Sequence, residues 1–163
     1  MLQQVCRHLS LRPIILLDSE YGNASFLNQT TDIEADLFMR IRSNRCLYAA
    51  PPEYTGKGRP RKHGQKFKLN DPSTWWEATE TLEVEDVKLG RLRVHRWKNL
   101  HFSGSASTPM QLILVERLKP KSSQSQSKPL WLVWVGQEMP DLGQIWRKYL
   151  RRFAVDQRSK KAS

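Results

Sequence analysis

The feature that most constrains the fold is a short apolar run that ends at a carboxylate. Residues 14–17, Ile-Ile-Leu-Leu, lead into Asp18, and the turn residues Gly22 and Asn23 follow. This pattern predicts a buried strand over residues 13–18 with an acid at its end. Open α/β sheets bind their ligands outside the carboxyl ends of the strands, so Asp18 is a candidate catalytic residue. The alternative is that Asp18 only caps the following turn, a position that aspartate favours.

The charge of the chain favours a polyanionic partner. Among 163 residues, 27 are Lys or Arg and 16 are Asp or Glu, which gives a net charge of +11 and a pI near 10.0. Such an excess attracts nucleic acid at long range. No window approaches the roughly 18 apolar residues of a membrane span and no signal peptide is evident, so a cytoplasmic, nucleoid-associated protein is expected. Cys6 and Cys46 show no metal-binding spacing and are expected to be reduced, buried thiols.

Periodicity predicts both strands and helices along the chain. Strands are predicted where apolar residues run together or alternate with polar ones, over residues 13–18, 36–42, 46–48, 81–87, 91–97, 111–117 and 130–135. Helices are predicted over residues 2–9, over residues 23–31 with Asn23 as N-cap, and from Asp141 onward. The last helix carries an apolar stripe formed by Leu142, Ile145, Trp146, Tyr149, Leu150 and Phe153. Residues 119–128 are predicted to form a flexible surface loop.

Residues 57–68 form a basic segment with little to bury, which predicts a loop. Its candidate DNA-binding residues are Lys57, Arg59, Arg61 and Lys62. A Gly-Arg-Pro core between basic residues can lie extended in the narrow minor groove of A·T-rich DNA. Contact with phosphates, without reading of sequence, is the interpretation that the overall charge favours. A solvated run of charge is the remaining alternative.

Three polar side chains recur along the last predicted helix. Tyr149, Arg152 and Asp156 are separated by three and then four residues, so they line one stripe of a helix. Arginine binds phosphate oxygens bidentately, and a carboxylate binds Mg²⁺, so the stripe could serve a phosphate and a metal together. Alternatively, Arg152 and Asp156 form a surface ion pair and Tyr149 packs in the core.

In order along the chain, several motifs resemble those of bacterial insertion-sequence transposases of the DDE class. They are Leu17-Asp18-Ser19-Glu20-Tyr21-Gly22-Asn23, Arg42-Ser43-Asn44-Arg45, Gly58-Arg59-Pro60-Arg61-Lys62-His63-Gly64, Pro129-Leu130-Trp131-Leu132-Val133-Trp134 and Tyr149-Leu150-Arg151-Arg152-Phe153. The resemblance covers nearly the whole chain. It implies an α/β fold with an incomplete ribonuclease-H-like core, a mixed sheet with flanking helices, and a mainly-β insertion. Residues 1–50 would form the first part of the core, residues 51–128 the basic loop and insertion, and residues 129–163 a core strand and helix.

The resemblance also implies a chemistry. Members of the family use two aspartates and a glutamate to hold two Mg²⁺ or Mn²⁺ ions for cleavage and strand transfer of transposon-end DNA. By resemblance, Asp18 is the second aspartate, Asp156 occupies the acid position of the last helix, and both are metal ligands. Tyr149 and Arg152 fall on positions that contact DNA near the cut.

The sequence departs from the family pattern at three positions. The first aspartate is expected before Asp18 and is missing, and the family's lysine position falls on Ser163. Asp156 replaces a glutamate and withdraws the carboxylate by about 1.5 Å. We therefore expect a truncated copy that binds DNA but does not cut it alone, either as a homodimer or with a complementing transposase fragment. The alternatives are a non-catalytic basic DNA- or RNA-binding protein and an unstable pseudogene product.

Overall fold

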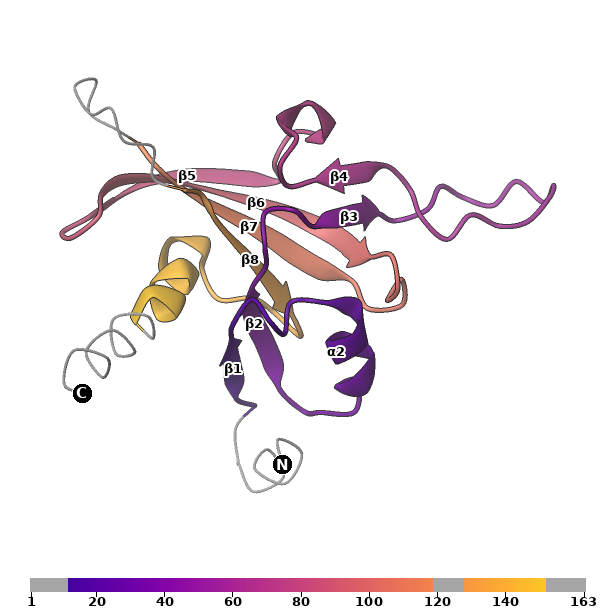
Figure 1. The fold of residues 1–163 in the computed structure, drawn as a ribbon, viewed down its shortest axis with the longest axis horizontal. Coiled ribbons are helices and arrows are strands. Elements are labelled where there is room, and N and C mark those ends of the chain that lie inside the picture. Colours follow the sequence, from indigo (N-terminus) through magenta and orange to yellow (C-terminus); the bar gives the residue numbers. More distant parts are fainter. Residues whose placement is uncertain (1–11, 119–127, 152–163) are drawn as a thin grey trace.

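The computed structural model describes residues 12–118 and 128–151, and within these ranges the chain forms one mixed sheet of eight strands (Figure 1). Seven strands follow one another across the sheet in the order β1 (Ile14–Leu17), β2 (Asp36–Arg40), β8 (Leu130–Val135), β7 (Met110–Arg117), β6 (Gly90–Phe102), β3 (Cys46–Ala49) and β4 (Lys66–Lys68). The eighth strand, β5 (Glu80–Asp86), pairs with β6 outside this order. The sequence therefore predicts the strand-rich character of the fold correctly.

Only the first two strands of the sheet are parallel. In β1 and β2, Ile14 pairs with Asp36 and Leu17 pairs with Met39, and every other pairing is antiparallel. The crossover between them contains α2 (Ala24–Gln29), whose N-cap is Asn23, because the Asn23 side chain accepts a hydrogen bond from the Phe26 N–H at 2.9 Å. The N-cap prediction is confirmed, and the helix ends two residues before the predicted end.

Each face of the sheet is covered by one helix over part of its area. Leu27 of α2 packs with Leu37, Met39 and Leu112, and we call their side the α2 face. The helix at residues 142–151 packs its predicted apolar stripe on the other side, where its residues join those of the strands in one core: Phe38, Ile113, Leu132, Trp134, Leu142, Ile145, Trp146 and Tyr149. We call that side the 142–151 face. The two helices lie on opposite sides of β1 and β2 (Figure 1).

An aromatic cluster closes the α2 face at the β4 end of the sheet. Phe67, which is fully buried, contacts the rings of Trp75, Trp76, Trp97 and Trp131 at centroid distances of 5.8, 5.0, 5.1 and 6.3 Å. The tryptophans follow β4 through the short 3₁₀ helix η1 (Pro72–Thr74) or lie on β6 and β8. Four of the six tryptophans thus serve a single packing site.

Several predicted boundaries are wrong. The strand predicted over residues 36–42 ends at Arg40, because the chain turns at Ser43 and Asn44 and the Arg45 N–H bonds the Arg42 carbonyl. The basic segment 57–68 is not all loop, since its last three residues pair with β3 as β4. Cys46 is a free thiol, as predicted, but is half-buried rather than buried.

Other predictions concern parts of the chain that the structure does not describe. The helix over residues 2–9, the loop over residues 119–127 and the end of the last helix, with Arg152, Phe153 and Asp156, lie outside the described residues. The strands of the three predicted segments join one sheet, since β3 pairs with both β4 and β6. The division into segments at residues 50 and 128 stays a prediction.

Candidate active site and nucleic-acid interface

Asp18 lies directly after β1, at the carboxyl end of a parallel strand, where its side chain is exposed. One of its carboxylate oxygens, Oδ1, accepts a hydrogen bond from the Ser19 N–H, and its carbonyl accepts one from the Tyr21 N–H at 3.1 Å. The structure is therefore compatible with both predicted roles of Asp18, the turn cap and the catalytic carboxylate. Asp18 does stabilise the following turn, and it also presents a carboxylate to solvent at the end of the strand.

Glycine at position 22 holds this turn against β2. A Cβ atom there would lie 2.6 Å from both the Arg40 carbonyl oxygen and the Ile41 Cγ2. A contact under 3.0 Å with backbone cannot be relieved by a side-chain rotation, so only glycine fits without displacing the chain. The turn after Asp18 is thereby fixed beside the end of β2.

The sheet register shows which face of the sheet the side chains of β1 occupy up to Leu17. Leu17 pairs with Met39 on the α2 face, and Leu16 packs in the opposite core with Phe38. Side chains alternate along a strand, so this alternation, continued one residue beyond the end of β1, would direct Asp18 toward the 142–151 face, on the side of Arg40. The ring of Tyr149 packs edge-on against Phe38 there, with centroids 6.3 Å apart. The helix that was predicted to contribute to the site therefore packs on the face toward which the end of β1 would direct Asp18.

Tyr149 is a core residue in this arrangement, with 4% of its surface exposed. Its burial matches the alternative in which the ring packs in the core. Arg152 and Asp156 lie outside the described residues, so the structure gives no distance from Asp18 to Asp156.

Asp18 is the candidate carboxylate for a metal ion at the end of β1. Within residues 12–118 and 128–151, no three His, Cys, Asp or Glu side chains form a group that could hold a metal ion. Mg²⁺ is commonly bound by one or two carboxylates together with waters and substrate phosphates, and an exposed carboxylate such as Asp18 fits that role. The prediction for Asp156 would supply a second carboxylate from outside the described residues.

The four predicted DNA-binding residues Lys57, Arg59, Arg61 and Lys62 are all exposed and lie on a loop between β3 and β4 that extends away from the sheet (Figure 1). None of the four forms an ion pair with a described residue. Gly58 has a left-handed backbone with φ of 75°, and its carbonyl accepts a hydrogen bond from the Tyr54 hydroxyl at 2.8 Å. The chain therefore turns at Gly58 instead of continuing in the extended form that minor-groove binding of the Gly-Arg-Pro core requires. Contact with phosphates remains the simpler prediction.

Sequence reasoning missed a histidine pair at the base of this loop. His63 Nδ1 and His101 Nε2 are 2.8 Å apart, and the Tyr48 ring lies 4.7 Å from the His63 ring. Burial, together with the charge of His63, lowers the pKa of His101. The two histidines are 38 residues apart and share no motif, so only the pairing of β3 with β6 brings them together.

Comparison with known families identifies the class of protein. A family model described as DDE superfamily endonuclease matches residues 1–101, which include Asp18 and the basic loop. The chain therefore belongs to the DDE superfamily of endonucleases, and this membership indicates a transposase-like nuclease that acts on DNA. A comparison with curated proteins finds no match. In the described part of the chain, no helix is long and apolar enough to span a membrane.

Proposed function

We propose that this chain is the catalytic part of an insertion-sequence transposase, in which Asp18 is a metal ligand for phosphodiester cleavage and strand transfer. The observation that carries the proposal is the position of Asp18. It is an exposed carboxylate at the carboxyl end of a parallel strand, within the region that matches the DDE superfamily endonucleases.

The residues of the chain have separable roles in this proposal. Bound Mg²⁺ or Mn²⁺ would activate a water or a DNA 3′-hydroxyl and stabilise the leaving oxygen. Asp18 would hold the cation at the edge of the sheet, and Asp156 would supply a second carboxylate. Arg152 would bind a phosphate of the DNA strand, and buried Tyr149 would fix the helix against Phe38. The exposed loop with Lys57, Arg59, Arg61 and Lys62 would hold the DNA backbone.

A second candidate function is non-catalytic DNA or RNA binding. This candidate is favoured by Asp156, whose side chain is one methylene shorter than the family's glutamate. Because Mg²⁺ accepts its ligands only at about 2.0–2.1 Å, the shorter side chain would hold its carboxylate too far from the ion. In that case the chain binds nucleic acid through its basic loop, and cleavage is slow or absent. The two candidates differ in whether Asp18 binds a metal ion.

Calorimetric titration with Mn²⁺ tests the proposal at Asp18. The substitution Asp18→Asn should abolish binding, while Glu20→Gln, which removes the same charge two residues away, should leave it unchanged. Nicking of supercoiled plasmid DNA in Mg²⁺ then measures catalysis, and Asp156→Glu should increase it. Equal Mn²⁺ binding by the Asp18→Asn and Glu20→Gln variants would refute the role of Asp18. DNA binding by a protein that takes up no Mn²⁺ would support the second candidate.

A further inference from the structure

The 142–151 face of the sheet is covered by the helix only over part of its width. The helix packs over β2, β8 and the adjoining parts of β7 and β6, where Phe38 and Ile113 are buried beneath it. Toward β4 the same face carries polar side chains. Tyr48 pairs with His101 on β6 and with Lys66 on β4, and paired residues point to the same side of a sheet, so these three side chains lie together. We call this region, which also includes Lys68 and Lys98, the uncovered face.

Charge is divided unequally between the two ends of the sheet. In the β5–β6 hairpin the carboxylates are paired with arginines, since Glu83 binds both Arg91 and Arg93, at 2.6 and 2.8 Å, and Glu80 binds Arg96. On the uncovered face, Lys66, Lys68 and Lys98 are exposed and form no ion pair with any described residue. Three exposed lysines without an ion pair to a described residue therefore lie at the end of the sheet that also carries the basic loop.

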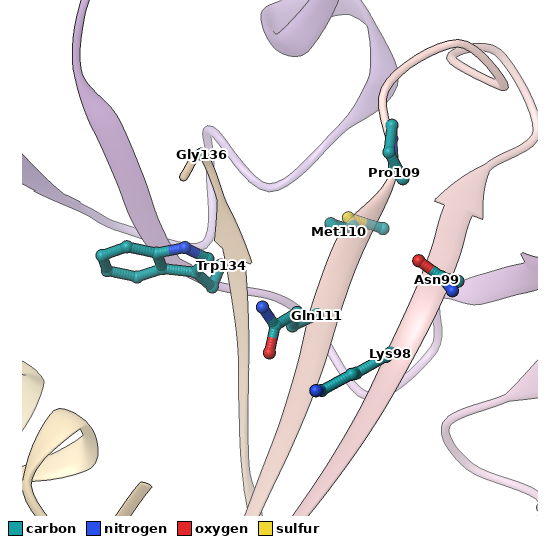
Figure 2. Close-up of a pocket in the computed structure, with 7 residues that line it drawn as sticks. All are labelled: Lys98, Asn99, Pro109, Met110, Gln111, Trp134 and Gly136. Atoms are coloured by element: carbon teal, nitrogen blue, oxygen red, sulfur yellow. The ribbon is translucent and has the colours of Figure 1, made fainter. Parts of the chain in front are cut away.

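A small pocket lies on this face beside the bulge in β6. It has a volume of about 180 Å³ and is lined by Lys98, Asn99, Pro109, Met110, Gln111, Trp134 and Gly136 (Figure 2). Lys98 extends from β6 toward Gln111 on β7, so an ammonium group and an amide group both line the pocket (Figure 2).

The pocket combines an irregular backbone with a buried polar atom that has no partner. The register shift between Trp97 and Leu100 forms the bulge, and within it Asn99 has a φ of 58°, the left-handed conformation that non-glycine residues rarely adopt. The Gln111 Oε1 atom is buried and finds no hydrogen-bond donor among the described residues. A buried acceptor without a partner is costly, and a ligand with a donor group would satisfy it.

We propose that the uncovered face is a second DNA-binding surface, on which Lys66, Lys68 and Lys98 contact phosphates and the Asn99–Gln111 pocket receives a base or sugar edge. Asparagine and glutamine amides offer the paired donor and acceptor that base edges require. Lys66 and Lys68 lie two residues apart on one strand, so their Cα atoms are about 6.8 Å apart and their side chains leave the same face of β4. The choice of DNA rests on the proposed function.

Salt-dependent binding of a fluorescent 30-base-pair duplex, measured by anisotropy in EDTA, tests this surface. A first variant removes the three lysines of the uncovered face, Lys66→Ala, Lys68→Ala and Lys98→Ala. A matched control removes three exposed cations elsewhere in the chain, Lys88→Ala, Arg117→Ala and Lys148→Ala. Each phosphate contact contributes about 0.9 to the slope of log K against log salt, so the first variant should lower the slope by about 2.7 and the control should leave it unchanged.

Equal changes of slope in both variants would overturn the proposal, because they would show that only net charge matters. No change in the first variant would overturn it as well. Circular dichroism confirms that each variant is folded before binding is measured. As a separate arm, Gln111→Glu places a carboxylate in the pocket and should weaken binding, while the isosteric Gln111→Met should weaken it less. The assay contains no metal ion, so its outcome is independent of the Mn²⁺ test at Asp18.

Discussion

Truncation of Phe67 should destabilise the protein more than any change in the exposed part of the basic segment. The side chain is fully buried and touches four tryptophan rings. Phe67→Ala would remove those contacts and leave a cavity beneath Trp75 and Trp97, so the expected loss in the free energy of unfolding is about 4 kcal/mol. For a chain of this length the melting temperature should fall by about 8–16 °C.

Urea denaturation followed by tryptophan fluorescence measures this loss directly, because four tryptophans surround the site. Val87→Ala is the matched control, since it also truncates an apolar side chain but at a fully exposed position in the β5–β6 turn. Its effect should stay within about 0.5 kcal/mol. A loss below about 1 kcal/mol for Phe67→Ala would refute the packing of β4 into the core and would restore the view of residues 57–68 as a free loop.

Two further predictions concern the site and the base of the loop. Gly22→Ala should lower the free energy of unfolding by about 1–3 kcal/mol, because its Cβ would overlap the Arg40 carbonyl. An unchanged thermal melt would contradict the packing of the Asp18 turn against the end of β2. Burial lowers the pKa of His101 below its unfolded value, so the folded state favours the neutral ring. The resulting stability is complete above the unfolded pKa and is lost as pH falls through the folded pKa. The urea midpoint should therefore decrease on acidification below about pH 6.5, and His101→Gln should flatten that decrease.

Local pattern was sufficient for most of the elements and for none of the long-range pairings. Alternation identifies the β5–β6 hairpin because its two strands are adjacent in sequence and joined by a short turn. The strand β4 was missed because a single apolar residue, Phe67, stands between two lysines, and its burial depends on tryptophans 8 to 64 residues away. The antiparallel pairing of β2 with β8 joins residues about 95 positions apart, which no local signal encodes.

For the candidate site, too, the local features could be predicted from the sequence and the contacts between distant strands could not. The position of Asp18 at a strand end follows from its neighbours in sequence, and so does the burial of Tyr149 in the apolar stripe of its helix. The pocket beside Asn99 was not predictable, because it depends on a bulge in β6 and on the distant strand β8. The contact of His63 with His101 likewise requires the folded sheet.

Charge is distributed unequally between two segments of the sheet. Residues 54–68 contain six basic and no acidic side chains, whereas residues 80–96 contain four of each and are neutral as a whole. The two segments end at opposite extremes of the molecule's longest axis (Figure 1). A polyanion is therefore attracted more strongly by the β3–β4 end of the sheet than by the β5–β6 hairpin. This difference acts within about a Debye length, before any atom touches, and raising the ionic strength weakens it along with the attraction.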